Sequence, residues 1–105
     1  MINNVQLGVA ETTIIQSGAS ETNAILSIVF CNTTLAAKTI TVYAYPSGSS
    51  AGDGTTIIKD LSIPAGDSYI WTGDEKFILA GSDKISGLAS VATSVTATYN
   101  YYTLG

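Results

Sequence analysis

The chain has 105 residues, enough for one domain with its own core, and 46% of them are apolar. Only 11% are charged, with eight acidic residues, four lysines, no arginine, no histidine and a net charge of −4. This composition argues against nucleic acid and anionic membranes as partners, because both bind clustered cations. With 14 threonines and 12 serines, the surface is expected to be rich in hydroxyls and to suit a protein packed against neighbours.

Short segments that alternate apolar and polar residues, separated by turn residues, predict strands along the whole chain. The expected strands are residues 5–9, 12–16, 23–31, 38–45, 55–63, 68–71, 76–79, 84–89 and 94–103. Eight or nine short strands without a helix predict an all-β fold, a single antiparallel β-sandwich that is jelly-roll-like or immunoglobulin-like. We expect one domain over residues 1–105, with a flexible surface loop at 46–54.

Two of these segments have further features. Residues 23–31 are almost continuously apolar, which predicts a central strand buried on both faces. Ile57 and Ile58 interrupt the alternation of their strand, which predicts a β-bulge.

Residues 60–71 predict a hairpin. Leu61 and Ile63 alternate with polar residues, and Pro64 and Gly66 then supply the backbone angles of a tight turn. Trp71 resumes the apolar side of the alternation after the turn. We therefore expect Leu61, Ile63 and Trp71 to enter the core, with the turn setting their register.

No residue pattern predicts catalysis. Cys31 lies in the most apolar strand and has no histidine anywhere to activate it, so we expect a buried, inert thiol. We predict a non-enzymatic protein with no catalytic, metal-binding or cofactor-binding residues. The sequence Asn32-Thr33-Thr34 fits a glycosylation pattern, but it is interpreted as a turn.

Acidic residues follow glycine or serine in several predicted turns, where aspartate stabilises the turn through its own backbone. The functional alternative is a calcium site, because carboxylates in neighbouring loops supply the oxygen ligands that calcium prefers. Its ligands would be Asp53, Asp74, Glu75 and Asp83. No EF-hand spacing accompanies them, so the turn interpretation is favoured.

Tyrosines gather on three predicted strands, and some of them should face outward. Exposed tyrosines mark protein interfaces, because they offer contact area at a low entropy cost. The candidate interface consists of Tyr43, Tyr45, Tyr101, Tyr102, Ser47, Ser49 and Asp53. Cross-strand packing and sugar stacking remain alternatives. The sugar alternative is a carbohydrate-binding module using Tyr43, Tyr45 and Tyr102.

Several stretches resemble small structural proteins of tailed bacteriophages. The turn Ile63-Pro64-Ala65-Gly66-Asp67 is similar to a recurrent turn of that family, and further similar stretches are 25–32, 76–79, 81–85 and 89–95. The resemblance covers about residues 22–98. It implies a virion component: a decoration (cement) protein on the capsid surface or, alternatively, a neck, tail or fibre protein. It also implies the major capsid protein or other virion proteins as partners, and a homo-oligomer, with a trimer favoured.

Overall fold

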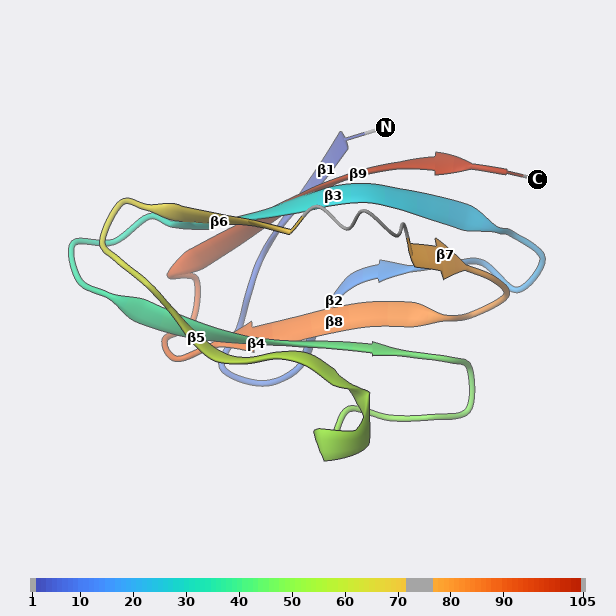
Figure 1. Cartoon of the computed structure of the whole chain (residues 1–105), viewed down its shortest axis with the longest axis horizontal. Coiled ribbons are helices and arrows are strands. Elements are labelled where there is room, and N and C mark those ends of the chain that lie inside the picture. Colours follow the sequence, from blue (N-terminus) through green and yellow to red (C-terminus); the bar gives the residue numbers. More distant parts are fainter. Residues whose placement is uncertain (1, 72–76, 105) are drawn as a thin grey trace.

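The computed structural model describes residues 2–71 and 77–104, and they form two antiparallel sheets packed face to face (Figure 1). The first sheet has the order β1-β9-β3-β6, with β7 also pairing with β3, and the second has the order β2-β8-β4-β5. The strands of the first sheet are β1 (Ile2–Gln6), β9 (Val95–Thr103), β3 (Asn23–Asn32), β6 (Ser68–Trp71) and β7 (Phe77–Leu79). Those of the second are β2 (Thr12–Gln16), β8 (Lys84–Ala89), β4 (Lys38–Tyr45) and β5 (Thr56–Ile63). The all-β sandwich is confirmed.

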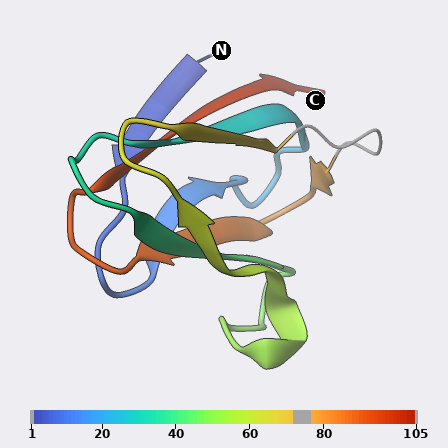
Figure 2. The same ribbon diagram turned by 60° about the vertical axis from the view of Figure 1, so that its left-hand side comes forward.

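The pairing of the strands is nested. β4 pairs with β5, β3 with β6 and β7, β2 with β8, and β1 with β9. The chain is therefore one long hairpin, with β4 and β5 at its tip, that is wound across both sheets. This winding is a jelly roll rather than an immunoglobulin-like sandwich. A short 3₁₀ turn, η1 (Asp53–Thr55), lies in the connection at the hairpin tip and projects from the body (Figure 2).

The core fills the space between the two sheets. On β3 the inward set includes Ile25, Ile28 and Phe30, and on β4 it includes Ile40 and Val42; all five are almost fully buried. Inward and outward residues alternate along β4 and from Ser27 onward along β3, as the two-residue period of a strand requires, and a bulge between Ile25 and Ser27 shifts the alternation of β3 by one residue. The alternation that predicted these strands thus also positions the core.

The predicted hairpin over 60–71 is wrong in its pairing. Asp67 N donates to Pro64 O at 3.0 Å and Gly66 has a φ of 70°, so the tight turn is present. However, β5 pairs with β4 in the second sheet, and β6 pairs with β3 in the first. The turn therefore carries the chain between sheets and sets no register between its flanking strands. Ile63 is buried, and Leu61 and Trp71 pack against the core, as predicted.

Two predictions for β3 and one for β1 also need correction. β3 is central in its sheet, but it is not buried along both faces: on the outer face Ala24 is buried, whereas Ser27, Val29 and Cys31 are partly exposed. Cys31 is consequently not the buried thiol predicted from sequence. The first strand is Ile2–Gln6 rather than 5–9, and Val9 is 61% exposed in the connection that follows.

The predicted bulge in β5 is confirmed. The register between β4 and β5 shifts between Ile40 and Val42 and again between Val42 and Tyr43. Asp60 has a φ of 48° at the first shift, and its backbone N–H donates to Thr41 Oγ1 at 3.1 Å instead of to a ladder carbonyl. The bulge therefore has its own hydrogen bond.

Asn32 ties the two sheets together at one end. Its side chain is fully buried, and its Nδ2 donates to the backbone oxygens of Ala36 at 2.8 Å and Ile63 at 2.9 Å. Its Oδ1 accepts from Thr34 N at 2.9 Å. These bonds agree with its interpretation as a turn residue and leave no free amide for a glycan. Among the described residues, no helix is long and apolar enough to cross a membrane.

Candidate functional site

The outer face of the first sheet carries no charged side chain among the described residues. The strand alternation places fourteen residues there, which together we call the uncharged face: Ile2, Asn4, Gln6, Ala24, Ser27, Val29, Cys31, Ser68, Ile70, Ile78, Thr96, Thr98, Asn100 and Tyr102. Depletion of charge is the compositional mark of the buried centre of protein interfaces. This face therefore has the composition of a contact surface.

Large apolar side chains stand out from this uncharged face. Ile2 is 68% exposed, Ile70 59%, Ile78 53% and Tyr102 46%. Val29 lies directly beside Ile70 in the β3–β6 register, and Ala24 lies between Ile78 and Tyr102. Polar contacts on the face are short and neutral, as where Asn4 Nδ2 donates to Thr98 Oγ1 at 2.7 Å. Burying such a face removes apolar area from water without desolvating a charge.

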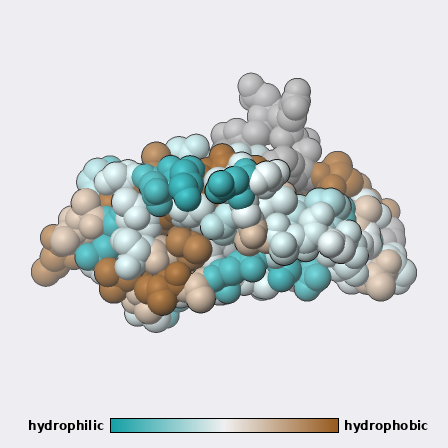
Figure 3. Space-filling model, turned by 90° about the horizontal axis from the view of Figure 1, so that it is seen from below, coloured by the Kyte–Doolittle hydropathy of each residue, from teal (hydrophilic) through white to brown (hydrophobic). Residues whose placement is uncertain are grey.

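The outer face of the second sheet is different, because it holds a charged hydrogen-bond network. Glu11 Oε2 accepts one bond from the Ser86 hydroxyl at 2.5 Å and a second from the Tyr45 hydroxyl. Figure 3 views the molecule from below and shows hydrophilic residues scattered over a surface of mostly intermediate hydropathy, together with a group of hydrophobic residues towards one end. The network connects the segment before β2 to β8 and to the end of β4.

These contacts shift the pKa of Glu11. The hydrogen bonds from Ser86 and then Tyr45 lower it below its ordinary value of 4.5, partial desolvation opposes them, and the positive charge of Lys84 adds a further lowering. Glu11 is therefore an ionised acceptor at neutral pH, and it holds the Tyr45 ring in place.

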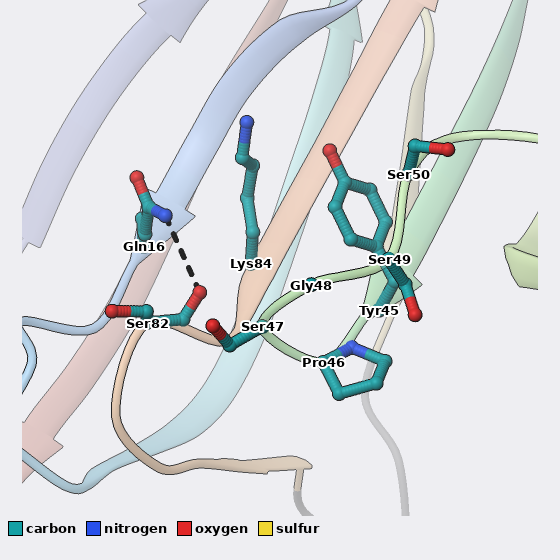
Figure 4. Close-up of a pocket in the computed structure, with 9 residues that line it drawn as sticks. All are labelled: Gln16, Tyr45, Pro46, Ser47, Gly48, Ser49, Ser50, Ser82 and Lys84. Atoms are coloured by element: carbon teal, nitrogen blue, oxygen red, sulfur yellow. Dashed lines mark hydrogen bonds between the residues drawn. The ribbon is translucent and has the colours of Figure 1, made fainter.

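A cavity of about 330 Å³ lies beside this network, where β2, β4 and β8 meet the β4–β5 connection (Figure 4). The register of the sheet places Gln16, Lys84 and Tyr45 in one row across these three strands. The other lining residues are Pro46, Ser47, Gly48, Ser49, Ser50 and Ser82. The cavity is thus walled by hydroxyls and one ammonium group.

The structure divides the predicted interface residues among several places. Tyr45, Ser47 and Ser49 meet at the cavity, and Tyr45 is only 9% exposed. Tyr102 lies on the uncharged face, whereas Tyr101 points inward, packs against the core and stacks on Tyr99 with 5.8 Å between ring centroids.

Tyr43 is half-buried on β4, and Asp53 is exposed in η1. Tyr43 and Tyr45 therefore belong to the second sheet and Tyr102 to the first. The three tyrosines cannot form one platform for sugar stacking, and that form of the carbohydrate hypothesis is wrong.

The predicted calcium ligands do not gather around an ion site among the described residues. Asp83 accepts from Ser47 N at 3.2 Å through Oδ1 and from Ala80 N at 3.0 Å through Oδ2, as a turn aspartate does. Asp53 lies in η1, and Asp74 and Glu75 lie outside the described residues. No group of three or more metal-ligating side chains occurs in the part of the chain that the structure describes.

Sequence reasoning missed Glu11, Gln16, Lys84 and the uncharged face. The first three are separated along the chain and meet only through pairing across β2, β8 and β4. The uncharged face had a usable signal, because β1, β3, β6 and β9 contain no charged residue at all.

Comparisons with known proteins give one distant similarity. No family model matches the chain, and no curated protein sequence matches it. Among solved structures, a chain of the Bacillus endospore appendages, which form a family of disulfide-linked pili, aligns with a TM-score of 0.49 and 14% identity. The alignment covers 100% of this chain and 85% of that chain.

Proposed function

We propose that this chain is a non-enzymatic structural protein of a bacteriophage virion. It binds the outer surface of the capsid as a decoration protein and reinforces the shell. The observation that carries the proposal is the uncharged face, on which Ile2, Ile70, Ile78 and Tyr102 are exposed. A charge-free surface with several exposed large apolar side chains suits permanent contact with a neighbouring protein. The phage-like stretches described above indicate which kind of neighbour.

The proposal assigns the uncharged face to the contact with the major capsid protein. Ile70 lies on β6 at the edge of this face, so a charge placed there must be desolvated on docking. Ile57 offers a matched control, because it is a partly exposed isoleucine, 38% exposed, on β5 at the edge of the other sheet.

The test measures binding of the purified chain to capsids assembled without it. We expect the unchanged chain and Ile57→Glu to bind in copies that follow the capsid lattice. Ile70→Glu should bind roughly tenfold or more weakly, because its carboxylate would lie in an apolar contact. Equal binding of both variants, or a cryo-EM map without density on the shell, would contradict the proposal.

The alternative location is the neck, tail or fibre of the virion. The uncharged face serves a protein contact equally well there, so the number of copies decides. A chain found only at the single vertex that carries the tail belongs to this alternative, whereas a chain at every equivalent lattice position belongs to the shell.

The proposal includes a homotrimer as the assembled form. Light scattering at micromolar concentration should then give three times the chain mass of 10.8 kDa. A mass of one chain would contradict a stable trimer in solution, and trimers could then form only on the capsid.

A further inference from the structure

The cavity beside Lys84 is built around a positioned ammonium group. Gln16, Lys84 and Tyr45 lie side by side on β2, β8 and β4, and the Lys84 Nζ lies 5.7 Å from the centroid of the Tyr45 ring. A cation over an aromatic face is held there by the negative charge of the π-system. In Figure 4 the Lys84 side chain extends between Gln16 and Tyr45. Nζ makes no hydrogen bond to the residues that the structure describes, so its donors are available to a ligand.

Hydroxyl groups form the rest of the wall. Ser47, Ser49 and Ser50 approach from the β4–β5 connection, and Ser82 from the turn before β8. The hydroxyls of these four serines make no hydrogen bond within residues 2–71 and 77–104. Gln16 Nε2 donates to Ser82 O at 3.3 Å, which leaves the amide oxygen of Gln16 as an acceptor.

The nearby carboxylates are already engaged and do not line the cavity. Glu11 accepts from Ser86 and Tyr45, and Asp83 accepts from two backbone N–H groups. The lining consequently carries one positive charge inside a protein of net charge −4. A ligand with one negative charge and several hydroxyl groups would complement this lining, exchanging bonds to water for bonds to Lys84 and the serines.

We propose that this cavity binds a single sugar unit that carries a carboxylate. The carboxylate accepts from Lys84 Nζ, and the ring hydroxyls exchange hydrogen bonds with the serines and the Gln16 oxygen. A volume of about 330 Å³ is near the lower end of ligand pockets and suits one sugar ring. A neutral sugar would make no charge-assisted bond to Lys84, and it could not stack on the face of the Tyr45 ring over which Lys84 Nζ lies. A doubly charged phosphate would find only one cation.

Uronic acids and sialic acids share this chemistry, and the test separates them. Amide chemical shifts of the ¹⁵N-labelled chain would be followed while glucuronic acid, N-acetylneuraminic acid, acetate, glucose and inorganic phosphate are added in turn. We expect one of the two acidic sugars to give saturable shifts at residues 45, 47–50 and 82–84, with a roughly millimolar dissociation constant. Acetate, glucose and phosphate should each bind at least about tenfold more weakly.

Two variants and one control complete the test. Lys84→Gln should weaken binding of the acidic sugar about tenfold, and Ser49→Leu should block it by filling the cavity without touching a strand. Lys59→Gln is the matched control, because Lys59 is an exposed lysine on β5 that does not line the cavity. Absent shifts with both acidic sugars, equal binding of acetate or phosphate, or unchanged binding in the folded Lys84→Gln and Ser49→Leu variants would each overturn the proposal.

This site stands apart from the proposed capsid contact, because the cavity belongs to the second sheet and the uncharged face to the first. The two surfaces can therefore be occupied together. Lys84→Gln should leave capsid binding unchanged, and Ile70→Glu should leave sugar binding unchanged, so failure of one proposal is distinguishable from failure of the other.

Discussion

The outer faces of the two sheets carry different kinds of side chain, although the sheets share one core. The first sheet directs threonine, asparagine and isoleucine outward, whereas the second carries the exposed Lys59 and the Glu11–Tyr45 bond. Desolvating a charge costs far more than covering apolar groups, or neutral polar groups that find a hydrogen-bond partner. The first face is therefore suited to be covered by protein, and the second is suited to remain in water and to hold a small polar ligand. One small fold can in this way combine a docking surface with an open site.

Substitutions at an inward and an outward residue of β3 test whether the uncharged face is exposed to water in the isolated protein. Phe30 is fully buried between the sheets, and its replacement by alanine should lower the free energy of unfolding by about 3–5 kcal/mol. Val29 points to the uncharged face, and Val29→Ala should cost about 1 kcal/mol or less. Urea unfolding measures both. A cost for Val29→Ala close to that of Phe30→Ala would show that the face is already covered in solution.

Substitution of Asn32 tests whether its hydrogen bonds hold the two sheets together. Asn32→Ala removes donors from the Ile63 and Ala36 carbonyls and an acceptor from Thr34 N, so the free energy of unfolding should fall by about 3 kcal/mol. Asn4→Ala is the control, since Asn4 makes an exposed bond to Thr98, and its loss should cost about 0.5 kcal/mol or less. Equal urea midpoints for the two variants would argue against Asn32 as the tie between the sheets.

Most strands were predictable because each needs only a local alternation of residues. The patterns over 38–45 and 84–89 match β4 and β8 residue for residue, and Pro64 and Gly66 do make a tight turn. The choice of partner strand was not predictable from those same residues. A tight turn reverses the chain, but the nested pairing of the whole jelly roll decides that β5 joins β4 while β6 joins β3.

The candidate sites show the same limit. Tyr45, Ser47 and Ser49 are neighbours in the chain, so a prediction from local sequence could place them in one candidate interface, and they do meet at the cavity. Lys84 and Gln16 reach it only through the β2–β8–β4 register, which no local pattern encodes. Tyr101 and Tyr102 are consecutive on a strand and point to opposite faces, but no local pattern says which of the two faces is inward.

The smallest expected change in the free energy of unfolding comes from Glu11, and it tests whether a charge on the second face stabilises the fold. Its folded-state pKa lies below the ordinary 4.5, so its bonds to Ser86 and Tyr45 add stability that is fully present above pH 4.5. That stability is lost as the pH falls below 4.5 through the folded-state pKa, because the protonated carboxyl no longer accepts charge-assisted bonds. Because Glu11 is exposed, water screens these bonds, and Glu11→Gln should cost only about 1 kcal/mol or less at pH 7 and progressively less at lower pH.

Urea unfolding of the unchanged chain and Glu11→Gln between pH 7 and pH 2.5 measures this difference. The Tyr45→Phe background supplies the control, because it removes one of the two donors to Glu11 and should reduce the pH-dependent difference without abolishing it. A difference that stays constant across this pH range would mean that the Glu11 carboxylate gains nothing from these donors when folded. The Glu11 carboxylate would then add no pH-dependent stability, and the contrast between the two faces would rest only on the presence of charged side chains such as Glu11, Lys59 and Lys84 on the second.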